Sequence, residues 1–177
     1  HSWCDNRWMD IAQAIRAIEA EVGRVSPVQK FLLGTDGSVT QLLESVTGKK
    51  VVIRTLVQEV VPADPATADN LNIAPGDPVN HRIVEIRTEA DGEVLIYAIS
   101  DTPLARLSPA FKDDLMKADI PIGRIISQHH IEARREILNA RVTTATEDAE
   151  RVFGICRHEP VLSRQYRIIP EVLSTAS

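Results

Sequence analysis

The sequence has 177 residues, 44% of them hydrophobic and 25% charged, and this size fits one globular domain spanning residues 1–177. Aromatic residues make up only 4%, so we expect a core of Val, Ile, Leu and Ala. The net charge of −5, with basic residues dispersed among carboxylates, argues against direct nucleic-acid binding.

The first third of the chain predicts helices followed by a strand. Apolar residues recur at helical spacing over residues 7–22, and Gly23 follows as a stop signal. Beyond this N-terminal helix, assigned to residues 1–26, the pattern predicts a short helix around Phe31 and a tight turn at 35–37. A further helix should start after Ser38 or Thr40 and end near Gly48. A β-branched stretch then predicts a strand.

The rest of the chain alternates strands with short helices. The strongest signal is a pair of strands joined at Asp91-Gly92, a dipeptide typical of β-hairpins. The predicted strands are 51–61, 79–88, 93–101 and 134–143, the predicted helices are 65–71, 111–117 and 125–132, and PIGR at 121–124 is predicted as a turn.

An internal repeat organises these elements. The segment ATADNLNIAPGDPVNHRIVEI, from Ala66, aligns with EDAERVFGICRHEPVLSRQYRII, from Glu147. Ala68 falls on Ala149 and, after one inserted residue, Arg82 falls on Arg164. A strand, a small helix, a turn and a strand are thus used twice, which predicts two related halves of one antiparallel sheet.

The second copy lacks the return strand that closes the first. After Ile169 the chain reads PEVLSTAS, and Pro170 cannot donate to a strand ladder. We therefore expect residues 170–177 to be an atypical or truncated tail and the last strand to have an open edge, through which the protein could form a homodimer.

Several motifs occur in the order seen in chorismate pyruvate-lyases. They are FLLGTDGSVTQLLESVTG, HRIVEIR with its hairpin, ADIPIGRII and LSRQYRII, within residues 27–169. The sequence resembles the archaeal, cyanobacterial and mycobacterial branch of that family, which shares its fold with the effector-binding domains of GntR-type regulators. The resemblance implies an α+β, chorismate lyase-like fold, an antiparallel sheet flanked by helices.

The resemblance also implies a binding site for a small anionic ligand, chorismate or an acid like 4-hydroxybenzoate. The family arginine that holds the ring carboxylate matches Arg82, and the two assisting backbone N–H groups match Val39 and Ile122. A planar guanidinium suits a carboxylate because it can donate two parallel hydrogen bonds. Arg124 is a candidate for a second ligand carboxylate. The alternative for Arg82 is an exposed residue paired with Glu85 or Glu59.

No residue of the sequence is assigned the acid–base role. The family glutamate lies on a final strand that would fall beyond the end of this chain, and Glu171 is a poor substitute because it precedes the expected turn. Glu132 and Glu136, four residues apart, are better explained as a solvated helix face.

No metal site or cofactor is predicted. Cys4 and Cys156 lack metal-ligand spacing, and His129 and His130 are adjacent, so their side chains would leave a helix in different directions. No apolar run is long enough for a membrane span and no signal-peptide pattern opens the chain, so we expect a cytoplasmic protein that does not bind membranes.

Two functions remain open at this point. The first is a chorismate lyase that releases pyruvate and 4-hydroxybenzoate, impaired if its catalytic strand is missing. The second is an effector domain that binds a small anion without turnover.

Overall fold

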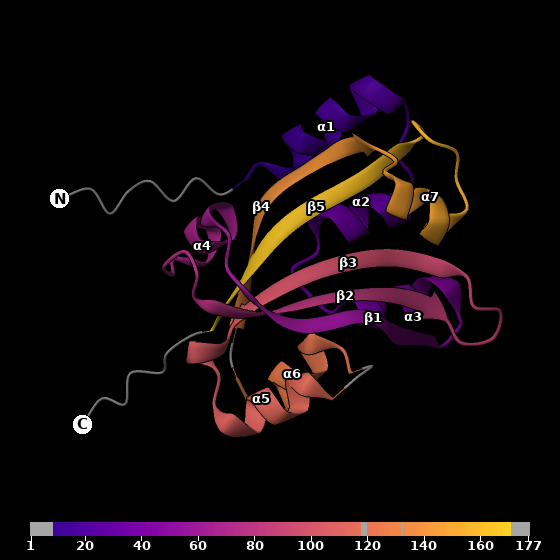
Figure 1. Ribbon diagram of the computed structural model, residues 1–177. Helices are drawn as coiled ribbons and strands as arrows, with labels where there is room; N and C mark the ends of the chain where they lie inside the picture. Colours follow the sequence, from indigo (N-terminus) through magenta and orange to yellow (C-terminus); the bar gives the residue numbers. More distant parts are fainter. Residues whose placement is uncertain (1–8, 118–119, 132, 171–177) are drawn as a thin grey trace, which may run out of the picture. The chain divides into compact units, whose positions relative to one another are not determined.

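The computed structural model describes residues 9–117, 120–131 and 133–170 (Figure 1). The first half holds α1 (Ile11–Val22), α2 (Pro27–Gly34), α3 (Val39–Thr47), β1 (Val51–Pro62), α4 (Pro65–Leu71) and β2 (Pro78–Thr88). Then follow β3 (Val94–Pro103), a 3-10 turn (Leu104–Arg106), α5 (Pro109–Met116), α6 (Ile122–Gln128), β4 (Ala133–Thr144), α7 (Glu147–Phe153) and β5 (Pro160–Pro170). The α+β class with antiparallel strands is confirmed.

The strands form two sheets, where the sequence predicted two halves of one. Antiparallel β1, β2 and β3 form a sheet in that order, and antiparallel β4 and β5 form a second one. Within the described residues β5 pairs only with β4, as expected for the last strand. The tail, residues 171–177, lies outside the described residues, so the predicted homodimer edge stays a prediction.

Two predicted turns differ from the structure. The PIGR segment is the start of α6, because Pro121 takes the N-cap position and Ile122 is the first helical residue. The hairpin between β2 and β3 is longer than a two-residue turn: Thr88 and Glu93 are joined by a backbone hydrogen bond of 2.9 Å. Gly92 has φ 69°, a conformation that glycine adopts without steric cost.

The repeat is longer and more regular than the sequence alignment suggested. Strands β1 and β4, helices α4 and α7, strands β2 and β5, and helices α2 and α5 each begin and end 82 positions apart. No residue is inserted, so Ala68 corresponds to Glu150 and not to Ala149. Both copies have a residue with positive φ just after the small helix, Asn72 and Gly154.

Backbone contacts around the small helix confirm this register. Ala63 N donates to Asp77 O at 2.8 Å, and the equivalent Ala145 N donates to Glu159 O at 2.9 Å. The side chains of Asp77 and Glu159 each accept from a backbone N–H three residues earlier, at 3.1 Å in both copies. The two copies therefore share even the hydrogen bonds of the turn that follows the small helix.

The chain divides into two compact units that exchange elements between the copies. One unit spans residues 48–130 and combines the strands of the first copy with α5 and α6 of the second. The other unit combines α1, α2 and α3 with β4, α7 and β5. Each unit therefore packs a helix pair of one copy on strands of the other. The prediction of a single domain stays a prediction.

Apolar side chains hold each unit together. In residues 48–130, Phe111 and Leu115 of α5 and Ile125 of α6 are buried, and Figure 1 shows these helices on one side of the three-stranded sheet. In the other unit, a cluster of Ile18, Val25 and Leu33 packs against β4 and β5. As predicted from the few aromatic residues, aliphatic side chains dominate both cores.

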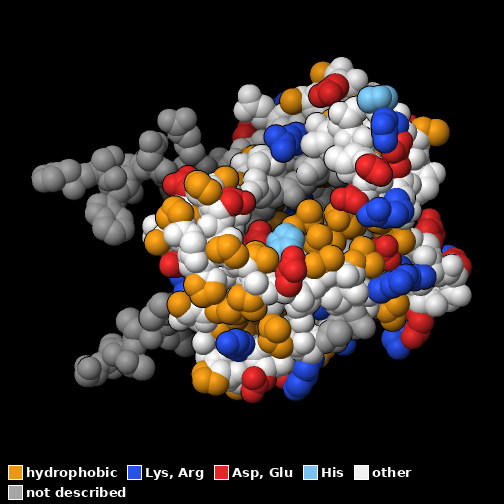
Figure 2. All heavy atoms as spheres, in the orientation of Figure 1, with side chains coloured by type: hydrophobic (Ala, Val, Ile, Leu, Met, Phe, Trp, Pro, Cys, Tyr) orange, Lys and Arg blue, Asp and Glu red, His pale blue; other side chains and the backbone are white. Residues whose placement is uncertain are grey.

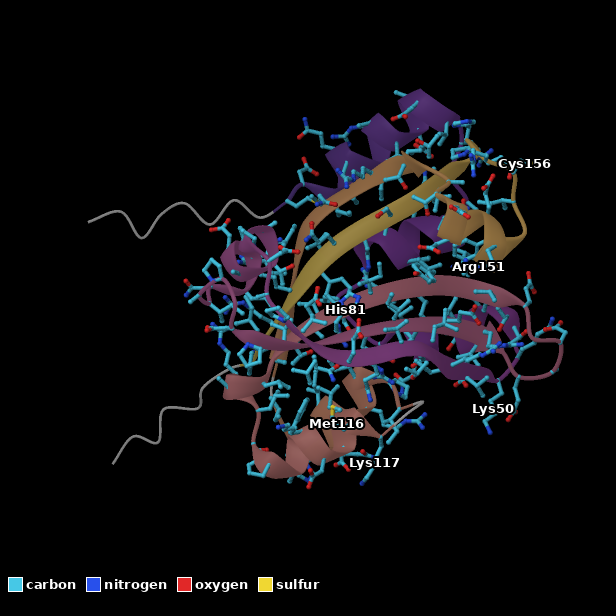
Figure 3. All side chains as sticks on the ribbon, in the orientation of Figure 1. Lys50, His81, Met116, Lys117, Arg151 and Cys156 are labelled. Atoms are coloured by element: carbon cyan, nitrogen blue, oxygen red, sulfur yellow. The ribbon has the colours of Figure 1, made fainter. Side chains whose placement is uncertain are left out.

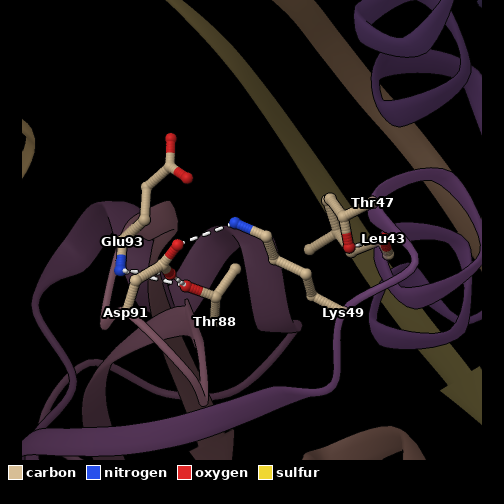
Figure 4. A network of polar contacts seen from close by, with 6 residues as sticks. All are labelled: Leu43, Thr47, Lys49, Thr88, Asp91 and Glu93. Carbon is tan, nitrogen blue, oxygen red and sulfur yellow. Dashed lines mark hydrogen bonds and ion pairs between the residues drawn. The ribbon is translucent and has the colours of Figure 1, made fainter.

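A polar network fixes the hairpin that leads into β3 (Figure 4). Lys49 Nζ lies 2.7 Å from Asp91 Oδ2, and the buried Thr88 hydroxyl donates to the other oxygen of Asp91. Glu93 N donates to Thr88 Oγ1 at 3.0 Å. Hydrogen bonds from Lys49 and Thr88 hold the pKa of Asp91 well below its usual value of 3.8.

We expect Asp91→Asn to destabilise the protein at neutral pH and progressively less in acid. A carboxyl group whose pKa is lower in the folded than in the unfolded protein stabilises the fold when the pH is above its unfolded-state pKa. This stabilisation is lost as the pH falls through the folded-state pKa. Urea unfolding at pH 7 and at pH 3 would measure the difference in free energy of unfolding between wild type and variant, which should be smaller at pH 3. Asp113→Asn, at an exposed position on α5, is the control. An equal difference in free energy of unfolding at both pH values would contradict the prediction.

Candidate functional site

Arg82 lies in the middle of the three-stranded sheet and is 3% exposed. Its neighbours across β1 and β3 are Gln58 and Ser100. The alternative of an exposed sheet arginine is therefore wrong. Side chains alternate along a strand, so Arg82 and Asn80 share the face that α5 and α6 cover.

Two neutral groups are among the partners of the Arg82 guanidinium. Nη1 donates to the main-chain oxygen of Ile120 at 2.9 Å, and Nη2 donates to Thr55 Oγ1 at 3.3 Å. Ile120 stands two residues before α6, so this contact ties the arginine to the segment that starts the helix. A planar guanidinium can donate two parallel hydrogen bonds to a carboxylate.

The helix pair next to Arg82 is held by an ion-pair cluster. Asp114 of α5 lies 2.6 Å from Lys117 Nζ and 2.7 Å from His129 Nε2, beyond the end of α6. Lys117 and His129 hold the pKa of Asp114 below its usual value. The His129 ring also packs on Phe111, with ring centroids 5.3 Å apart. These contacts fix α6 relative to α5.

The other predicted site residues take different positions. Ile122 is the first residue of α6, two positions beyond the carbonyl that Arg82 binds. Arg124 lies on the same helix and is exposed. Val39 is the first residue of α3, in the other unit. The backbone roles of Val39 and Ile122 and the ligand role of Arg124 stay predictions.

The repeat places a second arginine in an equivalent position. Arg164 of β5 donates through Nη1 to Thr35 O at 2.6 Å, directly after α2, and to Leu33 O at 3.4 Å, in the last turn of α2. Its guanidinium lies 4.7 Å from the centre of the Tyr166 ring. Burial lowers the pKa of Arg164. In both copies, a strand arginine thus binds the segment that precedes a helix of the other copy.

A cavity of about 280 Å³ lies on the opposite face of the sheet from Arg82. Glu59, Asp64, His81 and Asp101 line it, together with apolar residues such as Val61 and Val79. Figure 2 shows hydrophobic and acidic side chains gathered over α4 and the strands beside it. With three carboxylates and one imidazole, this cavity does not suit an anionic ligand.

His81 and Asp101 form a pair that the sequence analysis missed. His81 Nδ1 lies 2.7 Å from Asp101 Oδ1, and Figure 3 shows His81 on the side of the sheet away from Met116. The two residues are direct partners in the β2–β3 register. A two-residue turn at Asp91-Gly92 would place Thr102 opposite His81. The longer turn and the register shift between Ile86 and Arg87 place Asp101 there, so the pair could not be predicted from the sequence.

The remaining sequence candidates add no site. Glu136 lies on β4, so it cannot share a helix face with Glu132, which itself lies outside the described residues together with Cys4 and Glu171. No group of three or more His, Cys, Asp or Glu that could hold a metal ion occurs in residues 9–117, 120–131 and 133–170. None of the described helices is long and apolar enough to cross a membrane, and the cytoplasmic location stays a prediction.

The fold and the sequence together define the class of this protein. Residues 33–173 match the family described as Chorismate pyruvate-lyase Rv2949c-like, and the chain belongs to this family. The resemblance predicted from its motifs is thereby confirmed.

Among individual proteins, the chain is 36% identical over 114 residues to MJ0807, a candidate lyase of Methanocaldococcus jannaschii. The match covers 62% of this chain and 53% of MJ0807, so the chain spans about half the length of that relative.

Solved structures share the fold at low sequence identity. The effector domain of PhnF from Mycobacterium smegmatis superimposes with a TM-score of 0.62 at 15% identity, covering 76% of this chain and 80% of that domain. The C-terminal domain of Yurk from Bacillus subtilis gives a TM-score of 0.53 at 18% identity, covering 66% and 78%. The predicted relation to regulator effector domains holds at the level of the fold.

Proposed function

We propose that this protein binds chorismate through Arg82 and eliminates pyruvate from it to give 4-hydroxybenzoate. The observation that carries the proposal is a guanidinium 3% exposed between the sheet and α5–α6, whose Nη1 donates to Ile120 O and whose Nη2 donates to Thr55 Oγ1. Membership of the lyase family supports the reaction type.

To catalyse this reaction, the protein must orient chorismate and neutralise the negative charge of its carboxylates. The bond between the ring carbon and the enolpyruvyl oxygen breaks, and the ring carbon that bears the hydroxyl loses its hydrogen as a proton. The leaving enolate is protonated to pyruvate, so atoms balance without a co-reactant. Because aromatisation makes the reaction strongly downhill, holding the ring carboxylate in a low-dielectric site supplies much of what is needed.

Access to Arg82 requires α5 and α6 to move from the sheet, because the side chain is buried beneath them. The bond from Arg82 to Ile120 O is one contact between the strands and the segment before α6. A ligand carboxylate would replace this carbonyl as the acceptor for Nη1. Binding would thus exchange a neutral acceptor for a charged one.

Incubation of the full chain with chorismate tests the proposal. Pyruvate, measured by coupled reduction to lactate, and 4-hydroxybenzoate, measured by chromatography, should appear in equal amounts above the spontaneous background. A rate equal to that of chorismate alone would exclude the enzyme.

A second candidate function is an effector domain that binds a small anion without turnover. The superposition on 80% of the PhnF effector domain favours it. In that case calorimetry would show saturable binding of 4-hydroxybenzoate while no pyruvate is released.

A further inference from the structure

The cavity on the opposite face of the sheet from Arg82 contains a row of three polar side chains. Glu59, His81 and Asp101 are direct partners across β1, β2 and β3, so their side chains leave the sheet on the same side. All three line the cavity, which lies within the unit of residues 48–130. Neighbouring strands are about 4.8 Å apart, so a small ligand can reach one acceptor group from each strand.

The hydrogen bond between His81 and Asp101 decides which ring nitrogen can serve a ligand. A carboxylate can only accept, so the proton of this 2.7 Å contact belongs to His81 Nδ1. In a neutral imidazole the other nitrogen, Nε2, is then an acceptor. No described residue forms a hydrogen bond with Nε2. The pair therefore leaves an acceptor of His81 available to a ligand.

The carboxylates of this cavity are not neutralised by basic side chains. Among the described residues, no Lys or Arg forms an ion pair with Glu59, Asp64 or Asp101. Asp64 accepts a hydrogen bond from Thr67 N at 2.7 Å, and this bond holds the pKa of the Asp64 carboxyl below its usual value. The negative charge of the three carboxylates therefore favours a cationic ligand.

The second copy of the repeat forms the same strand pair without these groups. Arg141 occupies the position equivalent to Glu59, 82 residues later. Ser163 occupies the position equivalent to His81, and it is again the direct partner of Arg141. The backbone arrangement therefore requires neither a carboxylate nor an imidazole at these two positions. Their presence in the first copy is better explained by a ligand than by the fold.

We propose that this cavity binds a small organic cation, a primary ammonium group attached to a short apolar chain. An ammonium group has three N–H donors, which matches the three acceptor groups of Glu59, His81 and Asp101. The apolar chain packs against Val61 and Val79, as is usual in pockets that combine apolar walls with a few polar groups. The volume of about 280 Å³ restricts the site to small ligands. This site does not depend on the proposed function.

Calorimetric titration of the full chain with butylamine, methylamine, 1-butanol and butyrate tests the inference. A pH of about 8 keeps imidazole groups neutral. Butylamine should bind saturably and at least about tenfold more tightly than methylamine, because three more methylene groups leave water. Neither 1-butanol, which lacks the charge, nor butyrate, which has the opposite charge, should bind saturably over the same concentration range.

Substitutions of the carboxylates locate the binding. Glu59→Gln and, separately, Asp101→Asn should each weaken butylamine binding about threefold or more, and the double variant about tenfold or more. Glu59 is exposed, so Glu59→Gln provides the answer if loss of the contact with His81 unfolds Asp101→Asn. Asp69→Asn is the matched control, because it removes the same charge from an exposed position on α4 that does not line the cavity. It should bind butylamine as wild type does.

The inference is overturned if wild type does not bind butylamine, or if it binds 1-butanol equally well. It is also overturned if Asp69→Asn weakens binding as much as Glu59→Gln does, because the net negative charge of the protein would then attract the amine without a specific site. None of these results bears on the Arg82 site, which is tested separately with chorismate.

Discussion

Arg82→Gln is expected to weaken 4-hydroxybenzoate binding by about a hundredfold or more and to reduce pyruvate release from chorismate by a similar factor. Truncating one partner of a buried charge pair costs about 2–5 kcal/mol, most of it because the other charge is left unpaired. Calorimetry for binding and the coupled pyruvate assay for turnover measure the two effects.

Two further variants show whether the loss is specific. Arg82→Lys keeps the charge but loses the planar fork, so it should retain part of the binding. Arg87→Gln removes a cation five residues along the same strand, where Arg87 lies 3.8 Å from Glu85. It should bind like wild type. An Arg82→Gln variant with intact secondary structure and unchanged affinity would remove the carboxylate site from this position.

Local elements were the part of the structure that sequence patterns predicted best. The small helix 65–71 and the strands around Asp91-Gly92 agree with α4, β2 and β3 to within two residues. Short-range signals suffice here: Pro65 follows the N-cap Asp64, and Asn72 ends the helix in a left-handed conformation.

The exact register of the repeat could be determined only from the positions of the helices and strands in the structure. Matching Ala68 with Ala149 aligned two small residues, but the structure puts Glu150 at the position of Ala68, since equivalent helix positions need not carry similar side chains. The N-caps Asp64 and Thr146 lie 82 positions apart and would have given the register. The pairs Ser26-Pro27 and Ser108-Pro109, also 82 apart, mark the duplicated helices that the alignment left out.

The surroundings of Arg82 could not be predicted from sequence. Its contact with Ile120 spans 38 positions and depends on helices of one copy packing on strands of the other. Likewise, the side-chain NH₂ groups of Gln58 and Asn80 each donate a hydrogen bond to Met116 of α5. Such partners are set by tertiary packing, which no periodicity in the sequence encodes.

A substitution of Arg164, the equivalent of Arg82 in the second copy of the repeat, should show which arginine stabilises the fold and which binds the ligand. Both Arg82 and Arg164 bind a main-chain carbonyl next to a helix of the other copy. We expect Arg164→Gln to lower the free energy of unfolding by about 2–3 kcal/mol, because hydrogen bonds to charged groups contribute about 1.5–3 kcal/mol each and the longer bond, to Leu33 O, adds little.

Urea unfolding and amide hydrogen exchange over α2 and α3 would measure this loss, with faster exchange expected at the segment that Arg164 holds. Arg141→Gln, at an exposed position on β4, is the matched control and should stay within about 0.5 kcal/mol of wild type. Since the proposed ligand contacts belong to Arg82, the folded Arg164 variant should bind 4-hydroxybenzoate as wild type does. Normal stability with lost binding would reverse the roles assigned to the two arginines and move the anion site to the second copy of the repeat.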